Sequence, residues 1–321
     1  MLAILLAFCL STLLLICFAR LAPRWGFVDQ PNARSAHRSP TPVGAGICFA
    51  LAALLALFVP GVFPAETYSL LLILQSCGLV VAVVGLIDDR FTLPVGVRLL
   101  VYLTASIIAV ITLLEAAPLL LVGLAILALG WTINLVNFMD GVDGFVGTQT
   151  LCVCLSMAVI SLFIPEVPGI THFTLVLAAA LLPFIWRNWP PASLFMGDSG
   201  AVFLGFYLGC LGLYAAGQDN RLGAVWLIVM MPFIVDATCT LMIRLLEGKS
   251  LAEAHSEHGY QRILRATRSP LAVNCGLLVL HALWQFPLAL WAVFGPYSQI
   301  FAVIFSTIPS LALVAYSRSK S

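Results

Sequence analysis

The chain has 321 residues, of which 62% are hydrophobic and only 9% are charged, and its formal net charge is +1 at pH 7. Its 15 basic and 14 acidic side chains are too few to cover a globule of 34.5 kDa, which excludes a water-soluble enzyme and a disordered chain. A net charge this small also excludes a strongly basic nucleic-acid-binding protein, and the mean hydropathy of +1.08 indicates an all-α, polytopic membrane protein.

Eleven apolar windows follow one another along the chain and predict about eleven transmembrane helices. They cover residues 1–19, 43–60, 67–87, 99–114, 119–137, 145–164, 171–186, 199–216, 222–243, 271–294 and 297–316. The first window lacks a basic leader and is followed by Arg20 and Arg24, so it is interpreted as a retained span, not a cleaved signal peptide. No repeat or linker interrupts the series, which predicts a single membrane domain over residues 1–321.

The basic residues predict the orientation of the chain in the membrane. If the N-terminus lies outside, alternate loops become cytoplasmic, and of the 15 Lys and Arg residues only Arg221 falls on the outer side. Such an asymmetry is the positive-inside pattern of membrane proteins. We therefore expect an outer N-terminus and a cytoplasmic C-terminus.

Acidic residues at the cytoplasmic ends of the windows indicate where chemistry occurs, because an unpaired carboxylate near hydrocarbon is unfavourable. Asp88 and Asp89 close the third window. Two adjacent carboxylates repel each other, which favours a divalent cation, a bound base or a raised pKa. A hydrated loop turn is the alternative interpretation.

A second acidic motif lies at residues 134–144, after the fifth window. Asn137, Asp140 and Asp143 follow one another at a spacing of three, which places successive side chains on one face of a helix. The two glycines of this segment break the helix and let its carbonyls and carboxylates approach a ligand. A helix C-cap with a tight turn is the structural alternative.

A third motif, residues 188–200, precedes the eighth window. Asp198 can ligate a hard cation, and the helix that starts here presents free N–H groups that favour anions. Asp198 is equally suited to a role as a helix N-cap. Phe195 is either a stacking platform for a base or an interfacial aromatic residue.

Basic and histidine side chains in two predicted cytoplasmic loops indicate anion binding. His255 and His258 lack a third ligand for zinc, but together with Arg262 they suit diphosphate oxygens. An ordinary amphipathic surface helix is the alternative there. Arg38, in the first loop, belongs to a basic group that suits an anion site or a lipid headgroup.

Together these segments resemble the polyprenyl-phosphate N-acetylhexosamine-1-phosphate transferases, the membrane enzymes that begin bacterial cell-wall and O-antigen glycan assembly. The likeness spans most of the chain and is carried by Val28–Asn32 with His37, Asp88–Asp89, Asn137–Gly144, Phe195–Gly200 and residues 255–262. The last motif, His-x-x-His-x-Tyr-Gln-Arg, looks like that of the O-antigen-initiating subgroup. The peptidoglycan enzymes and the enterobacterial enzymes that transfer GlcNAc carry a His-rich run at that position.

The resemblance implies that a HexNAc 1-phosphate passes from a UDP-sugar, such as UDP-GlcNAc or UDP-FucNAc, to undecaprenyl phosphate, with release of UMP. It implies a requirement for Mg²⁺, with Mn²⁺ as the alternative ion, and a site on the cytoplasmic face of the bacterial inner membrane. No nucleic acid is expected as a partner, and a homodimer is left open.

The resemblance also assigns roles to individual residues. It implies Asp198 as the magnesium ligand, Asp88 and Asp89 as essential acids near the lipid phosphate, Asn137, Asp140 and Asp143 around the nucleotide-sugar, and Phe195 stacked on uracil. Six further residues are expected to bind the substrates: Arg38, Arg98, Asn188, His255, His258 and Arg262.

Two other functions are compatible with the acids at the inner face. One is an ion-coupled transporter, although transporters more often place their acids at mid-membrane in broken helices. The other is a lipid-phosphate hydrolase or a scaffold without transfer activity.

Overall fold

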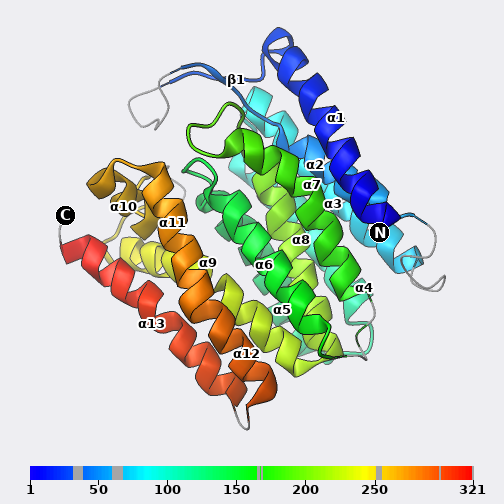
Figure 1. Cartoon of the computed structure of the whole chain (residues 1–321), viewed down its shortest axis with the longest axis vertical. Helices are drawn as coiled ribbons and strands as arrows, with labels where there is room; N and C mark the ends of the chain where they lie inside the picture. Colours follow the sequence, from blue (N-terminus) through cyan, green and yellow to red (C-terminus); the bar gives the residue numbers. More distant parts are fainter. Residues whose placement is uncertain are drawn as a thin grey trace.

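The computed structural model describes residues 1–31, 39–59, 68–164, 167, 169–250, 255–295 and 298–319, which form a bundle of α-helices with one small β-ribbon (Figure 1). The elements are α1 (Leu2–Trp25), β1 (Val28–Asp29), β2 (Thr41–Pro42), α2 (Gly46–Ala56), α3 (Tyr68–Phe91), α4 (Val95–Leu113), α5 (Leu119–Phe138), α6 (Phe145–Ser161), α7 (Ile170–Asn188), α8 (Gly197–Gln218), α9 (Asn220–Leu246), α10 (Gly259–Thr267), α11 (Pro270–Leu280), the π-helical turn η2 (His281–Gln285), α12 (Phe286–Phe294) and α13 (Ser298–Ser319). The expected all-α architecture is therefore observed.

Each of the eleven apolar windows contains a helical segment, but within the described ranges only nine segments are long and apolar enough to cross a membrane. The prediction of eleven spans is thus corrected to nine candidate spans. The two shorter segments are α2, with 11 residues, and α6, with 17 residues. An 11-residue helix is only about 17 Å long, whereas the hydrocarbon core of a bilayer is about 30 Å thick.

Helix α2 is apolar because it is buried in protein. Eight of its 11 residues are buried, and Phe49 and Ala50 are completely enclosed. A given side chain has the same hydropathy whether it packs inside a membrane protein or faces lipid. A hydropathy window therefore could not separate α2 from a lipid-facing span.

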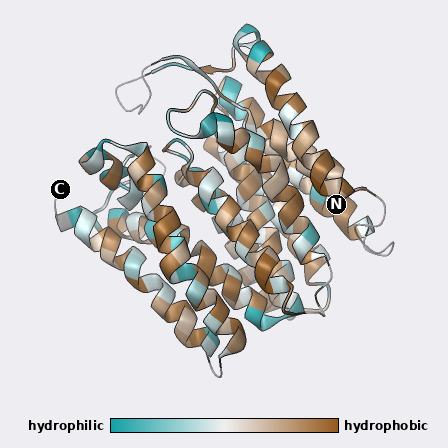
Figure 2. Cartoon of the chain, viewed as in Figure 1, coloured by the Kyte–Doolittle hydropathy of each residue, from teal (hydrophilic) through white to brown (hydrophobic). Residues whose placement is uncertain are grey.

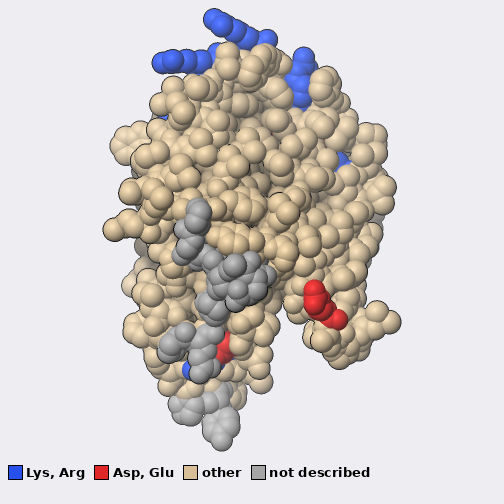
Figure 3. Space-filling view, turned by 90° about the vertical axis from the view of Figure 1, so that its right-hand side faces the viewer, with Lys and Arg blue, Asp and Glu red and all other residues tan. Residues whose placement is uncertain are grey.

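Charged residues gather at the ends of the helices. Figure 2 shows hydrophobic residues along the helix bodies, and Figure 3 shows a face whose middle carries almost no charge, with Lys and Arg side chains at its upper end. Five of the long helices carry an arginine in their last turn: Arg24 in α1, Arg90 in α3, Arg187 in α7, Arg244 in α9 and Arg318 in α13. We refer to the end of the bundle where these five helices end as the cation-rich end.

Helix α8 lies at the centre of the bundle and is in contact with α2, α3, α4, α5, α6 and α9. Glycines allow this close packing, because each would overlap a neighbour if it carried a side chain. A Cβ at Gly85 of α3 would lie 2.7 Å from the Ser199 Cα, and a Cβ at Gly205 would lie 2.6 Å from the Ile133 Cα of α5. The start of α8 is therefore fixed tightly against the ends of α3 and α5.

The β-ribbon lies over the cation-rich end, near the end of α1 (Figure 1). Its two strands are antiparallel, with Val28 opposite Pro42. The segment after the ribbon pairs with the chain before α8, because the Phe195 N–H donates to the Pro42 carbonyl at 2.8 Å and the Ala45 N–H donates to the Phe195 carbonyl at 3.1 Å. The ribbon thus connects the segment that precedes α8 to the loop between α1 and α2.

Candidate active site

A cavity of about 280 Å³ opens at the cation-rich end and is lined mainly by polar side chains. Its lining residues are Asp29, Val43, Asp89, Asn137, Asp140, Gly141, Val142, Asp143, Asn188, Phe195, Met196, Gly197 and Asp198. A larger cavity of about 530 Å³ lies between α5, α8, α9 and α13, but its lining is almost entirely apolar. The smaller cavity is therefore the candidate active site, and it brings together three sequence motifs from distant parts of the chain.

Asp88, at the end of α3, is buried and pairs with a basic residue of the next helix. Its Oδ1 accepts a hydrogen bond from the Leu93 N–H, and its Oδ2 accepts one from Arg98 Nη1, both at 2.5 Å. The same Arg98 Nη1 lies 3.3 Å from Oδ2 of Asp198. One guanidinium group therefore bridges a carboxylate of α3 and a carboxylate of α8.

Asp89 has a different role from its neighbour. Its two carboxylate oxygens accept hydrogen bonds from the backbone N–H groups of Asp198 at 2.7 Å and Ser199 at 3.2 Å. These are free N–H groups of the first turn of α8, so Asp89 caps this helix from α3. The arrangement requires glycine at position 197, which has a φ of 68° and where a side chain would overlap the Asp89 carboxylate.

Asp198 points into the cavity from the first turn of α8. Its Oδ1 accepts a hydrogen bond from Asn137 Nδ2 at 3.0 Å, so the end of α5 orients this carboxylate. The sequence left open whether Asp198 is an N-cap. In the structure the cap of α8 is Asp89, and the Asp198 side chain faces the cavity.

Asp140 lies in the loop between α5 and α6 and lines the same cavity. Burial raises its pKa to about 7, and the negative charges of Asp198 and Asp143 add to the shift. Among the described residues its carboxylate has no hydrogen-bond or ion-pair partner, which leaves it open to a ligand. This concentration of negative charge makes the cavity a place where a cation is favourable.

Asp143 and Asn188 hold the loop around them. Asp143 Oδ2 accepts a hydrogen bond from the Ala192 N–H at 3.0 Å. The side-chain amide of Asn188 makes two hydrogen bonds to the backbone: its Oδ1 accepts from the Gly144 N–H at 2.9 Å, and its Nδ2 donates to the Leu194 carbonyl at 2.8 Å. Asn188, expected to bind substrate, therefore lines the cavity while its amide joins the loops on either side.

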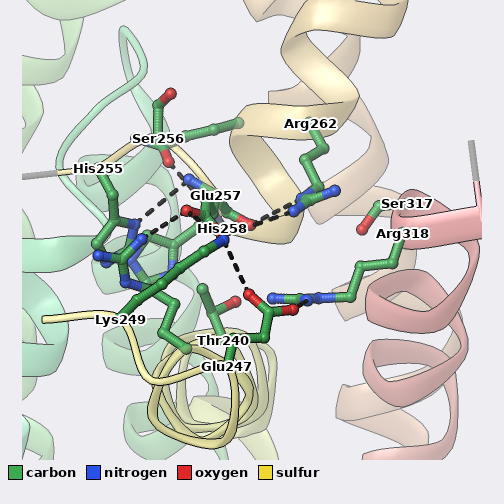
Figure 4. A network of polar contacts seen from close by, with 12 residues as sticks. Thr240, Glu247, Lys249, His255, Ser256, Glu257, His258, Arg262, Ser317 and Arg318 are labelled. Atoms are coloured by element: carbon green, nitrogen blue, oxygen red, sulfur yellow. Dashed lines mark hydrogen bonds and ion pairs between the residues drawn. The ribbon is translucent and has the colours of Figure 1, made fainter. Parts of the chain in front are cut away.

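Three residues expected at the site, His255, His258 and Arg262, do not line the acidic cavity. They belong to a neighbouring polar network that joins the ends of α9 and α13 to the start of α10 (Figure 4). His258 is buried, and its ring stacks on Phe138 of α5 at 6.3 Å between centroids. Arg262 Nε donates to the Glu257 carbonyl at 2.9 Å.

His255 packs against the ring of His258, with 4.9 Å between the ring centroids. Burial lowers the pKa of His255 to about 4, and the nearby His258 and Arg244 lower it further. At neutral pH this ring is therefore uncharged. Arg38, also expected to bind substrate, lies outside the described residues.

Sequence reasoning missed two residues that fix the geometry of this region. Asp236, inside the ninth apolar window, accepts hydrogen bonds from the N–H groups of Gly259 at 2.7 Å and Tyr260 at 2.9 Å, and so caps α10. Tyr260 donates its hydroxyl to the Phe138 carbonyl at 3.0 Å, at the end of α5. A carboxylate within an apolar window was the available signal for the first; the second stands in the His-x-x-His-x-Tyr-Gln-Arg motif, which marks its position but not its partner.

The donors around the cavity fit a hard divalent cation, because they are carboxylate and amide oxygens. Within the described ranges no group of three or more His, Cys, Asp or Glu side chains is close enough to hold a metal ion by itself. Mg²⁺ commonly binds through one or two carboxylates together with substrate phosphates and water. Asp198 and Asp140, on the same cavity, are therefore the residues that could hold a Mg²⁺ together with groups from outside the chain.

Comparison with known proteins adds independent information. The family model described as glycosyl transferase family 4 matches residues 70–216, which include Asp88, Asp140 and Asp198 but not residues 255–262. The chain is 31% identical over 295 residues to the decaprenyl-phosphate N-acetylglucosaminephosphotransferase of Mycolicibacterium smegmatis, covering 78% of this chain and 71% of that protein.

Two further relatives have similar names. The chain is 27% identical over 284 residues to the probable undecaprenyl-phosphate N-acetylglucosaminyl 1-phosphate transferase of Bacillus subtilis, covering 82% of this chain and 78% of that protein. It is 28% identical over 293 residues to the undecaprenyl-phosphate alpha-N-acetylglucosaminyl 1-phosphate transferase of Escherichia coli K12, covering 81% of this chain and 75% of that protein.

Proposed function

The chain belongs to glycosyl transferase family 4, and we propose from this premise that it transfers a HexNAc 1-phosphate from a UDP-sugar to undecaprenyl phosphate and releases UMP. The three relatives are transferases of N-acetylglucosamine 1-phosphate to a polyprenyl phosphate, according to their names. The product, a lipid diphosphate-sugar, starts the assembly of O-antigen or a related cell-envelope glycan.

The observation that carries this proposal is the position of the acidic cavity. Asp140, Asp143 and Asp198 line one cavity at the ends of apolar helices that are long enough to cross a membrane. A polyprenyl phosphate stays in the bilayer, whereas a UDP-sugar stays in water. A site that joins them has to lie at the boundary between the two, and a cavity at the ends of helices long enough to cross a membrane supports that placement.

We place the Mg²⁺ at Asp198. Asn137 fixes the orientation of that carboxylate through its hydrogen bond to Oδ1, and Asp140 stands on the same cavity. Bound there, the ion neutralises negative charge on the diphosphate of the UDP-sugar, with Mn²⁺ as the alternative ion. Without a cation the carboxylates would repel a substrate that is itself an anion.

The two acids at the end of α3 take different roles. Asp88 and Arg98 lie next to Asp198, where the phosphate of the lipid acceptor has to meet the nucleotide-sugar. We assign Arg98 to the acceptor phosphate and Asp88 to its immediate surroundings. Asp89 acts through α8, because its hydrogen bonds to the first turn of that helix hold Asp198 in place.

The nucleotide-sugar is assigned to the opposite side of the cavity. Phe195 is half-buried at the cavity wall and offers its ring to uracil, while Asp140 and Asp143 surround the sugar diphosphate. The adjoining loop does not itself line the cavity, but we assign His255 and Arg262 to diphosphate oxygens that extend beyond it, with the buried His258 holding this loop by stacking on Phe138. Because His255 is uncharged at neutral pH, its contribution is a hydrogen bond, and the positive charge comes from the arginine.

We further propose that the whole chain acts as one membrane domain in the bacterial inner membrane, with the N-terminus outside and the cation-rich end in the cytoplasm. This orientation is supported by the arginines in the last turns of α1, α3, α7, α9 and α13, which follow the positive-inside pattern. It places the cavity on the side where UDP-sugars are available.

The identity of the transferred sugar is indicated by the loop before and at the start of α10. The motif at residues 255–262 supports an enzyme of the O-antigen-initiating type, for which UDP-FucNAc is a candidate donor beside UDP-GlcNAc. Purified protein in detergent, given undecaprenyl phosphate and Mg²⁺, is expected to release UMP from one donor of a panel of UDP-HexNAc sugars. Release with none of them, together with ion-driven solute uptake into proteoliposomes, would instead establish a transporter.

The assigned metal ligand is tested by Asp198→Asn, which is expected to abolish UMP release while the protein still folds. The matched control is Asp219→Asn at the other end of the bundle, where an aspartate caps α9 and pairs with Arg221. This control is expected to keep full activity. Near-normal turnover of Asp198→Asn would remove that residue from the metal site.

A further inference from the structure

The peptide group between Asp143 and Gly144 is held by two asparagine side chains from different helices. Its N–H donates to Asn188 Oδ1 at 2.9 Å, and its carbonyl accepts from Asn274 Nδ2 at 2.7 Å. Asn188 ends α7, and Asn274 lies in α11, 131 residues after Asp143. Both polar atoms of one peptide group are thus bound by side chains that reach it from opposite directions.

Asn274 is fully buried in a helix that is otherwise apolar enough to cross a membrane. Its Nδ2 also donates to the Pro270 carbonyl of its own helix at 3.0 Å, and its Oδ1 has no hydrogen-bond partner among the described residues. Burying an unpaired amide oxygen is unfavourable. Apart from the bond to Pro270 in its own helix, the bond that the Asn274 amide makes is the one to the Asp143 carbonyl, outside α11.

The geometry of Gly144 explains why this peptide needs to be held. Gly144 has a φ of 77°, in the left-handed region, and it is the residue from which α6 starts. A Cβ at this position would lie 3.4 Å from Asn274 Nδ2. The chain therefore turns sharply between the acidic loop and α6, and the two asparagines fix the plane of the peptide at that turn.

The orientation of this peptide determines where the Asp143 side chain points. The Asp143 carboxylate receives the Ala192 N–H at 3.0 Å on the cavity wall, and Asp140 lies three residues earlier in the same short loop. The loop is held at its other end by the hydrogen bond from the Tyr260 hydroxyl to the Phe138 carbonyl. Rotation of the Asp143–Gly144 peptide would therefore be taken up within the loop and would move both carboxylates.

We propose that Asn274 is a positioning residue of the active site, which acts with Asn188 to hold the Asp143–Gly144 peptide and thereby to keep Asp140 and Asp143 directed into the cavity. The inference rests on the proposed transferase function, since it concerns the loop assigned to the nucleotide-sugar. It gives α11, a helix that does not line the cavity, a defined part in catalysis. It also makes Asn188 a positioning residue, where the sequence suggested direct substrate contact.

The first test replaces each asparagine by leucine, which has a similar size but cannot donate or accept. Asn274→Leu and Asn188→Leu are each expected to lower kcat for UMP release per folded molecule by about 10-fold to 100-fold, because misplacing a reacting group by about 1 Å costs that much. The double variant is expected to be about as slow as one single variant, since both act on the same peptide. Losses that multiply would contradict a shared target.

Gln285→Leu provides the matched control. Gln285 lies in η2, is fully buried, and donates its amide to the Ser306 carbonyl at 3.3 Å, a contact that involves no residue of the acidic loop. It is expected to lower the melting temperature while leaving kcat per folded molecule unchanged. If Asn274→Leu behaves in the same way, with lost stability and normal kcat, the positioning role is refuted.

A second measurement is independent of activity. Backbone amide hydrogen exchange over residues 139–147, in detergent and without substrate, is expected to be at least about 10-fold faster in Asn274→Leu than in the wild type and unchanged in Gln285→Leu. Wild-type protein that releases no UMP would refute the proposed function, whereas exchange unaltered by Asn274→Leu would refute the inference. If Asn274→Leu does not fold, Asn274→Ala removes the donor with a smaller side chain, and normal kcat and exchange in that variant would refute the inference equally.

Discussion

Gly197 begins α8 with a φ of 68°, and a Cβ at this position would overlap the carboxylate of Asp89. In Gly197→Ala the backbone strain alone costs about 1–2 kcal/mol, because L-residues disfavour the left-handed region. The added methyl group also displaces Asp89 from the N–H groups of Asp198 and Ser199, and a hydrogen bond to a charged group contributes about 1.5–3 kcal/mol. The expected loss is therefore about 2.5 kcal/mol if one bond breaks and up to about 8 kcal/mol if both break.

The assay is the free energy of unfolding in mixed detergent micelles, measured alongside UMP release by the same preparation. The control is Gly123→Ala in the second turn of α5, where nothing lies within 4 Å of an added Cβ. Because alanine favours a helix over glycine by about 1 kcal/mol, this control is expected to be neutral or stabilising. A Gly197→Ala protein within about 1 kcal/mol of the wild type and with normal activity would refute the capping role of Asp89.

Three further changes test other parts of the region. Arg98→Ala leaves two neighbouring carboxylates without their shared guanidinium, so Mg²⁺ is expected to raise its melting temperature more than that of the wild type; an equal or smaller rise would contradict a metal site at these acids. His255 has a pKa of about 4, so His255→Gln is expected to leave the pH dependence of activity between pH 5.5 and 8 unchanged. If the substitution removes one side of the pH–activity curve in that range, the conclusion that the ring is uncharged is contradicted. The same shift has a stability consequence: since the pKa is about 6.5 in an unfolded chain, acid destabilises the folded wild type between about pH 6.5 and 4, and the variant should lose less stability on acidification over that range. Arg318 lies 3.3 Å from Glu247 at the exposed end of α13, and Arg318→Ala is expected to cost less than about 1 kcal/mol of unfolding free energy, because solvent screens such pairs; a loss of several kcal/mol would show that this contact anchors the helix.

The sequence by itself determined the class of structure. A long apolar segment can adopt few stable structures in a bilayer, because backbone N–H and C=O groups without water have to hydrogen-bond to each other. The helix is the simplest structure in which they do so. For the same reason the end of the bundle that carries the acids was readable, since most charged residues lie at helix ends. The family resemblance was readable too, because its motifs are short, local and in a fixed order.

The sequence could not distinguish segments or residues of the same chemical type that have different surroundings in the fold. Helix α2 was predicted as a span, yet protein and not lipid covers it, and hydropathy is equal in the two cases. Asp88 and Asp89 are chemically identical neighbours, but one pairs with Arg98 and the other caps α8.

Only the tertiary structure decided these partners, because each is a hydrogen bond between residues far apart in the chain. The bond from Asp198 to Asp89 spans 109 residues, and the bond from Asn274 to Asp143 spans 131. Such bonds form when packed helices bring two backbones within about 3 Å, a distance set by side chains all along the helices. A motif specifies which chemical groups are present, whereas the packing of the helices determines which group each of them meets.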